Sequence, residues 1–321
     1  KNTYAFEAGQ YLTLKTKIDG QEIRRDYSIS SSPRSNDLTV TIKEIENGIF
    51  SSFANQELKV GESIAVAPPK GRFTYTTNSD RQNTIVAFAA GSGITPIMSI
   101  LKTVLDTNTS QKFVLVYGNK TPEETIFFKT LHDLKTQYPT RFELQYVYSQ
   151  AQGESALFGR IDKGNTNYSL KNLINIDQTS AFYLCGPEKM IHTVKEVLLQ
   201  HNVCEDDILF ELFTATTTVA EAQVSIPSGP TKATVLVDDE TTEISVNSEQ
   251  TILEAALKHD VDVPYSCQGG VCSSCICRIT KGTAEMRQNS VLTDGEVAEG
   301  LVLSCQAVPT SAVIHIDFDD V

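Results

Sequence analysis

Four of the seven cysteines, all near the C-terminal end of the chain, follow a spacing that is typical of metal ligands. Four residues separate Cys267 from Cys272, two separate Cys272 from Cys275, and Cys305 follows after a further twenty-nine. With this spacing, four cysteine thiolates hold the two irons of a plant-type [2Fe–2S] cluster. The sequence therefore predicts an iron–sulfur centre with these four residues as its ligands.

The residues within and around this run help to decide between an iron–sulfur cluster and a zinc site. Gly269 and Gly270 lie in the first interval, where the backbone must turn towards the inorganic sulfurs. Zinc is the rival interpretation, although structural zinc sites usually have two knuckles of two ligands each. Cys277 lies outside the spacing and is predicted to be a strand residue, whereas Cys204 is predicted to be an ordinary core cysteine. Clustered cysteines in an odd total also indicate a reducing compartment, so we expect a cytoplasmic protein.

A second chemical signal is the run Gly91-Ser-Gly-Ile-Thr-Pro96, which follows an apolar segment and precedes a helical pattern. A glycine pair between a strand and a helix lets the backbone approach a pyrophosphate, whose negative charge the helix N-terminus favours. The third glycine of the usual dinucleotide fingerprint is absent, so the run alone is a weak indicator. Lys120 follows the next apolar strand, where a basic residue could meet the 2′-phosphate of NADPH. NADPH is therefore slightly favoured over NADH.

The charge of the chain is acidic and unevenly distributed. In 321 residues, 40 Asp and Glu oppose 27 Lys and Arg, which gives a net charge of −13. From Thr231 onward, fifteen acidic and five basic residues give −10, so the preceding part carries only −3. This sign disfavours nucleic acid as a partner, and no segment reaches the roughly 20 apolar residues of a membrane-spanning helix. An acidic C-terminal part would instead suit a basic patch on a protein partner, with ordinary solubility as the alternative.

The elements that must position these residues fall into three parts. Residues 1–79 alternate in polarity at 11–18 and 38–45 between turn signals, which predicts an antiparallel β-barrel. Residues 80–213 alternate apolar strands with helical patterns, which is typical of a parallel α/β sheet. Residues 214–230 are predicted to be a flexible linker, and residues 231–321 to contain a hairpin followed by a helix. In the second part, strands are expected at 85–90, 113–117, 142–148 and 181–184, and helices at about 95–106, 123–137 and 187–201.

The last part, residues 231–321, resembles the plant-type ferredoxin family along its whole length. The resemblance rests on the four-cysteine spacing and on the stretch Leu303-Ser-Cys-Gln-Ala307 around the fourth ligand. It implies an α+β fold of the β-grasp type that binds a [2Fe–2S] cluster.

The upstream parts resemble the ferredoxin–NADP reductase superfamily, through Arg25-Asp-Tyr-Ser28 followed by Gly48-Ile-Phe-Ser-Ser52. The resemblance implies that Tyr27 stacks on a flavin ring, while Arg25 meets the pyrophosphate charge bidentately. Ser28 is expected to hydrogen-bond near the reactive N5 of the flavin. The resemblance also implies pyrophosphate contacts at a helix start, which favour FAD over FMN, from Gly48, Ser51 and Ser52.

Three later runs match further markers of the same superfamily. Gly91, Gly93, Thr95 and Pro96 form its G-x-G-x-T-P motif, which implies binding of the nicotinamide nucleotide. The run Cys185-Gly-Pro-Glu-Lys-Met190 implies that Cys185, Gly186 and Pro187 lie beside the nicotinamide, with a buried structural cysteine as the alternative for Cys185. Glu211-Leu-Phe213 implies a pair that closes over the flavin, with Phe213 in place of the usual tyrosine. The catalytic side chains implied by these matches are Ser28, Cys185 and Glu211.

The order of the three parts resembles the reductases of multicomponent oxygenases, and among them those of ring-1,2-phenylacetyl-CoA epoxidases. It implies that electrons pass from NAD(P)H through FAD to the [2Fe–2S] cluster and on to an oxygenase, expected to hold a di-iron centre. Flavin stands between the other two because NAD(P)H gives two electrons as a hydride, whereas the cluster accepts one at a time. The reductase of a Rieske or steroid-hydroxylating oxygenase, and a non-enzymatic iron–sulfur carrier, remain as alternatives. Such reductases begin with a strand or two before the segment at Gly9, so the first part is expected to be truncated at its N-terminus.

Overall fold

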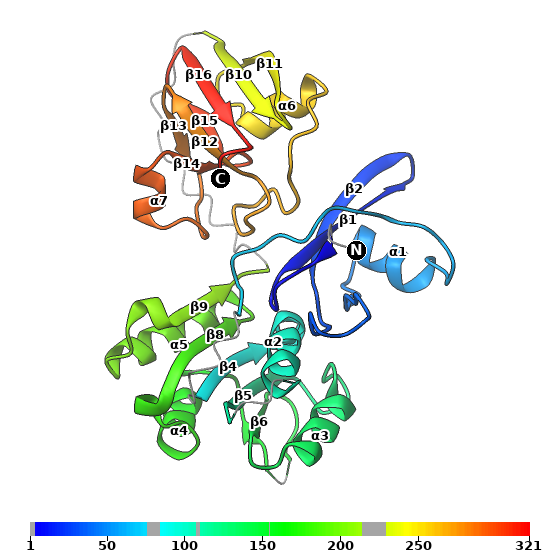
Figure 1. The fold of residues 1–321 in the computed structure, drawn as a ribbon, viewed down its shortest axis with the longest axis vertical. Helices are drawn as coiled ribbons and strands as arrows, with labels where there is room; N and C mark the ends of the chain where they lie inside the picture. Colours follow the sequence, from blue (N-terminus) through cyan, green and yellow to red (C-terminus); the bar gives the residue numbers. More distant parts are fainter. Residues whose placement is uncertain (1–3, 76–83, 107–109, 154, 214–228) are drawn as a thin grey trace. The chain divides into compact units, whose positions relative to one another are not determined.

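The computed structural model describes residues 4–75, 84–106, 110–153, 155–213 and 229–321 (Figure 1). The chain divides into two compact units, residues 1–213 and 214–321. The predicted linker at 214–230 lies almost wholly outside the described residues. No helix in the described part of the chain is long and apolar enough to cross a membrane.

The first part of the N-terminal unit is a small antiparallel sheet with strand order β2-β1-β3. β1 (Tyr11–Ile18) and β2 (Gln21–Ser28) form a hairpin, whose two turn residues both have positive φ and so match the twist of the strands. β3 (Ala65–Val66) pairs with the other edge of β1, and α1 (Ile49–Gln56) covers the sheet. The buried core of this part consists of Leu12, Leu14, Ile29 and Phe50.

The prediction of a regular strand at 38–45 is wrong. Only Val40 makes a ladder contact in that segment, an isolated antiparallel bridge to Ile29. Both edges of β1 are already occupied by β2 and β3, so the alternating segment cannot pair with β1. β2, which does pair with β1, has few apolar residues, so its sequence shows no alternation of apolar and polar residues.

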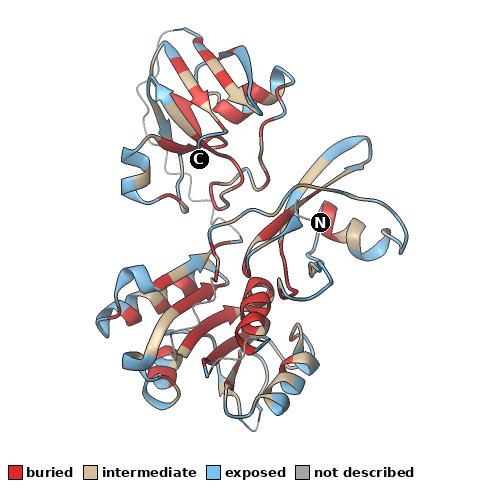
Figure 2. Cartoon of the chain, in the orientation of Figure 1, coloured by how far each residue is buried: buried red, intermediate tan, exposed pale blue. Residues whose placement is uncertain are grey.

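The second part of this unit is a six-stranded sheet in which every described pair is parallel, with strand order β7-β6-β5-β4-β8-β9. β4 and β5 at its centre are almost completely buried (Figure 2), which explains why their sequences read as continuous apolar runs. The strands are β4 (Thr84–Ala90), β5 (Lys112–Asn119), β6 (Phe142–Tyr148), β7 (Leu157–Phe158), β8 (Thr179–Cys185) and β9 (Ile208–Glu211). All four strands predicted here are confirmed.

The helices of this part differ from the prediction mainly in where they begin. α2 starts two residues before Pro96, which is tolerated because first-turn N–H groups have no helical acceptor. α3 starts at Phe128 rather than at 123, and Pro187 precedes α5 instead of opening it. The helices are α2 (Ile94–Asp106), α3 (Phe128–Gln137), α4 (Lys163–Asn172) and α5 (Glu188–Gln200), with single turns η2 (Gly91–Gly93), η3 (Ile176–Gln178) and η4 (Glu205–Asp207). No helix was predicted at the position of α4.

The C-terminal unit is an α+β fold with a five-stranded mixed sheet, in the order β11-β10-β16-β12-β14, and a two-stranded sheet of β13 and β15. β10 and β11 form the predicted hairpin, and α6 begins at a capping box between Thr251 and Glu254. The strands are β10 (Thr231–Val237), β11 (Glu240–Val246), β12 (Ile276–Lys281), β13 (Ala284–Met286), β14 (Leu301–Leu303), β15 (Ala307–Pro309) and β16 (Val313–Asp317), and the helices are α6 (Ile252–Lys258) and α7 (Asp294–Ala298).

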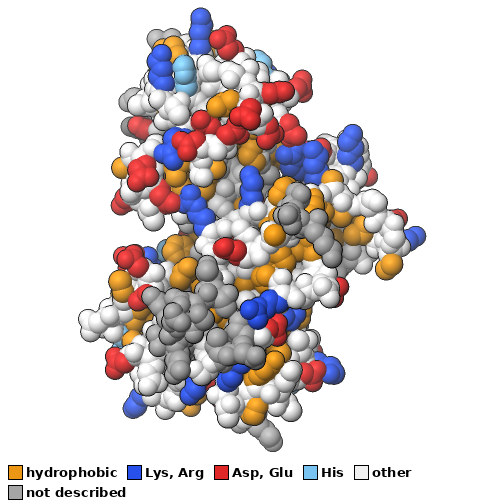
Figure 3. Space-filling model, in the orientation of Figure 1, with side chains coloured by type: hydrophobic (Ala, Val, Ile, Leu, Met, Phe, Trp, Pro, Cys, Tyr) orange, Lys and Arg blue, Asp and Glu red, His pale blue; other side chains and the backbone are white. Residues whose placement is uncertain are grey.

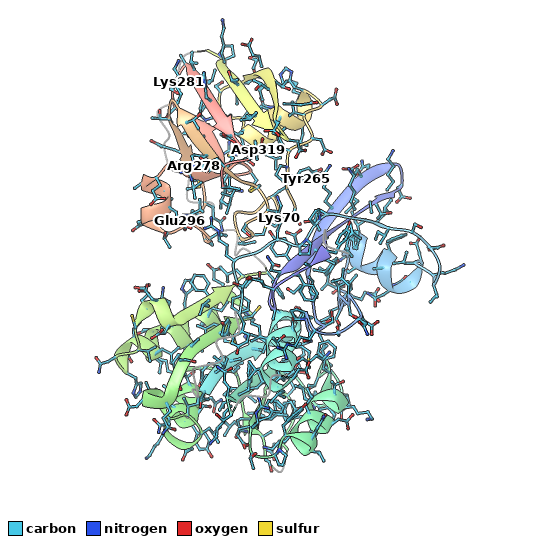
Figure 4. The ribbon with its side chains drawn as sticks, viewed as in Figure 1. Lys70, Tyr265, Arg278, Lys281, Glu296 and Asp319 are labelled. Carbon is cyan, nitrogen blue, oxygen red and sulfur yellow. The ribbon has the colours of Figure 1, made fainter. Side chains whose placement is uncertain are left out.

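Two charged residues labelled in Figure 4 join the ends of these elements. The Arg278 guanidinium on β12 donates to the Glu299 carbonyl after α7 at 2.8 Å and pairs with the Asp320 carboxylate at 3.0 Å. The Asp319 carboxylate accepts two backbone N–H groups of the β10–β11 turn, each at 2.9 Å. Acidic side chains gather on the visible face of this unit (Figure 3), as expected from the net charge of −10 of residues 231–321.

Candidate redox sites

The residues predicted to hold the flavin lie at the end of β2. Arg25 and Tyr27 share one face of this strand, because side chains alternate, and Ser28 lies on the other face, where it is buried. The Tyr27 ring is 5.5 Å from the Phe50 ring on α1, at an angle of 39°. Burial raises the pKa of Tyr27 to about 12, so its phenol stays protonated. The ring is thus fixed on one side by Phe50 and is only partly buried, which suits a stacking role.

The first turn of α1 brings together the other residues predicted to meet a diphosphate. Gly48 is the N-cap, and its carbonyl accepts the Ser52 N–H at 2.9 Å. The Ser51 hydroxyl donates to the same carbonyl at 3.1 Å and accepts the Ile45 N–H at 3.3 Å. A Cβ on Gly48 would lie 2.4 Å from Ser51 Oγ and 2.5 Å from Ile45 Cγ1, so both side chains would have to move. The Ser51 hydroxyl therefore makes its hydrogen bonds within the turn itself, which the sequence did not indicate.

Ser28, Cys185 and Glu211 come together although they lie far apart in the chain. Cys185 and Glu211 are paired across the parallel strands β8 and β9, and the Ser28 hydroxyl interacts with the Glu211 carboxyl. Glu211 Oε2 is buried with no hydrogen-bond partner among the residues that the structure describes. An orphaned buried oxygen of this kind leaves room for a donor from a bound cofactor.

The electrostatics of this group keep it neutral. Burial raises the pKa of the Glu211 carboxyl from 4.5 to about 8; the charge of Asp26 adds to the rise and the Ser28 hydroxyl opposes it. Burial, and secondarily Glu211, also raises the pKa of the Cys185 thiol well above its usual value. At pH 7 Glu211 therefore carries a proton, which it can exchange near pH 8.

The glycine-rich turn after β4 packs directly against the end of β8. A Cβ on Gly93 would lie 2.2 Å from the Cys185 carbonyl oxygen, and one on Gly186 would lie 2.9 Å from Met190 Cε. The Gly91 carbonyl accepts the Tyr117 hydroxyl at 2.9 Å, and the Thr95 hydroxyl donates to the Ser92 carbonyl at 3.0 Å. Glycines are needed here for close approach of two backbones, and the same lack of side chains exposes the backbone to a ligand.

A cavity of about 580 Å³ opens beside this turn, and it is large enough for part of a dinucleotide. Three predicted residues line it, namely Gly91, Lys120 and Pro187. Of the other predicted nucleotide residues, Gly93, Thr95 and Pro96 are buried behind the turn, and Phe213 is 38% exposed at the end of β9.

The basic residues of the cavity outnumber the acidic ones. Lys120 pairs with Glu124 at 3.6 Å, so much of its charge is offset within the cavity. Arg160, directly after β7, makes no side-chain hydrogen bond or ion pair to any described residue. Sequence reasoning missed Arg160, because β7 is only two residues long and has no periodic pattern. The charged lining residues are Lys43, Lys120, Arg160 and Lys189, against Glu124 and Asp162.

The four predicted metal ligands meet in the C-terminal unit. Cys267, Cys272 and Cys275 belong to the loop between α6 and β12, and Cys305 follows β14. The Cys267 thiol interacts with those of Cys272 and Cys305, and the Cys275 thiol interacts with that of Cys305. Cys267 Sγ also accepts the Gly269 N–H at 3.3 Å. Four converging sulfurs with backbone donors are the donor set that an iron–sulfur cluster needs.

The close contacts among the thiols shift their pKa values in opposite directions, and those with Cys267 and then Cys275 raise the pKa of Cys305. Contacts with Cys272 and then Cys305, together with backbone N–H groups, lower the pKa of Cys267. Among the described residues, no group of three or more His, Cys, Asp or Glu side chains is arranged to hold one metal ion. A two-iron cluster differs from that case, because its ligands are divided between two metals.

The remaining cysteines give one confirmation and one correction. Cys277 is a buried residue of β12, as predicted. Cys204 was predicted to be a core residue and is instead exposed, between α5 and η4. Residue type alone does not determine burial, and Cys204 has no apolar periodicity around it.

Comparison with protein families matches each of the three parts in the order predicted. An oxidoreductase FAD-binding domain matches residues 1–75, an oxidoreductase NAD-binding domain matches residues 88–196, and a 2Fe-2S iron-sulfur cluster binding domain matches residues 235–310. The proposed ligands all lie within the last of these ranges.

Similar proteins cover nearly the whole chain. One of the subunits of 1,2-phenylacetyl-CoA epoxidase from Escherichia coli (strain K12) is 38% identical over 99% of this chain and 90% of its own length. The ferredoxin reductase component of 3-ketosteroid-9-alpha-monooxygenase from Rhodococcus rhodochrous is 32% identical over 99% of this chain and 89% of its own length. The crystal structure of phthalate dioxygenase reductase shares the fold, with a TM-score of 0.60 and 24% identity over 98% of this chain and 88% of that one.

The fold and these sites define an NAD(P)H-dependent oxidoreductase that uses FAD and a [2Fe–2S] cluster. The chain belongs to the family of flavin and iron–sulfur reductases that includes this component of phenylacetyl-CoA epoxidase. The predicted fold class, with its flavin, nicotinamide and ferredoxin parts, and the predicted enzyme class are confirmed, as are the three cofactor types.

Proposed function

We propose that this protein transfers electrons from NADPH to the di-iron oxygenase component of a phenylacetyl-CoA epoxidase in the cytoplasm. The observation that carries the proposal is the 38% identity to a component of such an epoxidase, which spans all three cofactor domains. Bound FAD supplies the conversion of a two-electron hydride into single electrons. The chain's own residues bind and orient the cofactors and hold protons near them.

In this proposal the flavin is held at the end of β2. Tyr27 stacks on its ring, Arg25 neutralises pyrophosphate charge, and the first turn of α1 offers backbone N–H groups to the same phosphates. Support comes from the half-buried Tyr27 ring beside Phe50 and from Gly48 at the N-cap of α1. Glu211, whose Oε2 is buried and unpaired among the described residues, holds a proton beside the site.

The nicotinamide nucleotide is proposed to bind in the cavity beside Gly91, with Cys185 and Gly186 behind the nicotinamide end. The preference for NADPH is supported by the four basic and two acidic side chains that line the cavity. Lys120, the residue that the sequence indicated, is partly neutralised by Glu124, so Arg160 is the better placed cation for a 2′-phosphate. A guanidinium binds phosphate through two parallel hydrogen bonds.

The substitution Arg160→Gln tests this preference. It should raise KM for NADPH about tenfold, because a hydrogen bond to a charged group contributes about 1.5–3 kcal/mol, and leave KM for NADH unchanged. Lys163→Gln is the matched control, since Lys163 pairs with Glu196 at 2.7 Å and does not line the cavity. An equal effect of Arg160→Gln on both nucleotides would contradict a 2′-phosphate contact.

The cluster ligands are proposed to be Cys267, Cys272, Cys275 and Cys305. Cys305→Ser should abolish NADPH-driven reduction of cytochrome c, which takes its electrons from the cluster, while ferricyanide reduction by the flavin survives. Cys204→Ser is the control, because Cys204 is an exposed cysteine outside the spacing. Cytochrome c reduction by Cys305→Ser at the rate of the control would refute this ligand set.

The partner is tested by reconstitution with purified oxygenase components. Addition of the epoxidase oxygenase should couple NADPH oxidation to epoxide formation, with a rate that falls as salt rises because residues 231–321 carry a net charge of −10. A second candidate, a steroid monooxygenase, is favoured by the relative that is 32% identical. Coupling to a ketosteroid 9α-hydroxylating oxygenase, and not to the epoxidase, would replace the first candidate with the second.

A further inference from the structure

The residues on either side of Cys305 have side chains that point to the cysteine sulfurs. Ser304 is completely buried, and Gln306 is partly exposed. Backbone hydrogen bonds fix both: the Ser304 N–H donates to the Cys275 carbonyl at 2.9 Å, and the Gln306 N–H donates to the Leu303 carbonyl at 2.8 Å. The two side chains are therefore held on a rigid backbone beside the proposed cluster.

The Gln306 amide uses both of its N–H donors between two loops. Nε2 donates to the Gln268 carbonyl at 3.0 Å and lies 3.8 Å from Cys305 Sγ, within the range of an N–H···S hydrogen bond. The opposite amide orientation would set two oxygens, Oε1 and the Gln268 carbonyl, against each other. The contact with Gln268 therefore fixes the amide so that a donor faces the Cys305 sulfur.

The acceptor that lies beside the Ser304 hydroxyl is the Cys275 sulfur. Ser304 Oγ is buried without a hydrogen-bond partner among the described residues, and it lies beside the Cys275 thiol. Buried hydroxyls are almost always hydrogen-bonded, so the buried Ser304 hydroxyl is expected to donate to an acceptor close to it. A Cys275 sulfur that carries negative charge as a metal ligand would be a much better acceptor than a thiol.

We propose that Ser304 and Gln306 are positioning residues that donate hydrogen bonds to the sulfurs of Cys275 and Cys305 and thereby raise the reduction potential of the cluster. The inference rests on the proposed set of four cysteine ligands. Reduction adds one electron and no proton, so the sulfurs become more negative and each hydrogen bond strengthens. Hydrogen bonds to ligand sulfurs are one of the factors that set iron–sulfur potentials.

The test is a mediated reductive titration of the full chain, with iron content and the electron paramagnetic resonance of the reduced cluster measured on the same samples. Ser304→Ala and Gln306→Leu should each lower the equilibrium constant for one-electron reduction about tenfold, a shift of about 59 mV to more negative potential. Ser245→Ala and Gln250→Leu are matched controls on β11 and in the turn before α6, and their potentials should equal that of the wild type.

Each other outcome has a definite meaning. Potentials equal to those of the controls, with iron content unchanged, overturn the proposal. Loss of iron from Ser304→Ala overturns the role given to Ser304, because removal of one donor should leave four thiolates in place. Retention of a normal cluster by Cys305→Ser would instead refute the ligand set itself, so a failure of the proposed function is distinguishable from a failure of this inference.

Discussion

Glu211 is the residue whose buried chemistry makes the most quantitative prediction. Its carboxyl lies at the end of β9 beside Ser28, and burial is the main cause of a pKa raised from 4.5 to about 8. Glu211→Gln keeps the shape of the side chain and removes its ionisation. The variant should therefore change how stability depends on pH while leaving the packing nearly intact.

The sign follows from proton binding in the two states. Between pH 4.5 and about 8 the folded protein keeps a proton on Glu211 that the unfolded chain releases, so the free energy of unfolding falls as pH rises. A pKa difference of roughly 3.5 units, at 1.36 kcal/mol each, corresponds to about 5 kcal/mol over this window. Below pH 4.5 this contribution is fully present, and above pH 8 it is lost.

The assay is urea unfolding of the wild type and Glu211→Gln at pH 5, 6.5 and 8, followed by circular dichroism with FAD present in both. The free energy of unfolding of the variant, relative to the wild type, should rise by about 3–4 kcal/mol from pH 5 to pH 8, because the rest of the effect falls outside this range. Glu57→Gln, which removes an exposed carboxylate after α1, serves as the control. Parallel pH profiles for Glu211→Gln and the wild type would show that Glu211 ionises normally, and the reasoning would be wrong.

Two further substitutions probe the proposed cofactor sites. Gly93→Ala places a Cβ 2.2 Å from the Cys185 carbonyl oxygen, so the turn must move; thermal unfolding should show a loss of about 1–3 kcal/mol, and an unchanged melting temperature would contradict this packing. Tyr27→Leu removes the proposed stacking partner of the flavin and should weaken FAD binding about two- to tenfold, measured by the fluorescence of released flavin, since aromatic stacking contributes about 0.5–1.5 kcal/mol beyond buried area. Phe53→Leu, on the same helix as the Phe50 ring, is its control and should retain flavin.

Local patterns explain which parts of the fold the sequence could predict. The cysteine spacing is readable because three ligands come from one loop, so their separation along the chain reflects their separation in space. The central strands β4 and β5 are readable because both of their faces are buried and their sequences are continuously apolar. In contrast, β2 is half exposed and rich in charge, and only its pairing with β1 makes it a strand.

The residues that were missed depend on contacts distant in sequence. Arg160 reaches the nucleotide cavity because the two residues of β7 pair with β6, and no periodic pattern marks so short a strand. The raised pKa of Glu211 depends first on its burial and then on the charge of Asp26, nearly the whole N-terminal unit away in the sequence. Gln306 contacts Gln268 and Cys305 and so joins two segments of the chain. The motif predicts that the cysteines of these segments meet, but it says nothing about the residues beside them.

The central claim is that one chain carries electrons from a nicotinamide nucleotide through flavin to an iron–sulfur cluster. An anaerobic visible titration of the purified protein, with FAD and cluster content measured first, tests it most directly. Addition of NADPH should bleach both the flavin and the cluster bands, and NADH should require a higher concentration for the same effect. Cluster bands that stay unchanged while FAD is bound and NADPH or NADH is in excess would contradict the account.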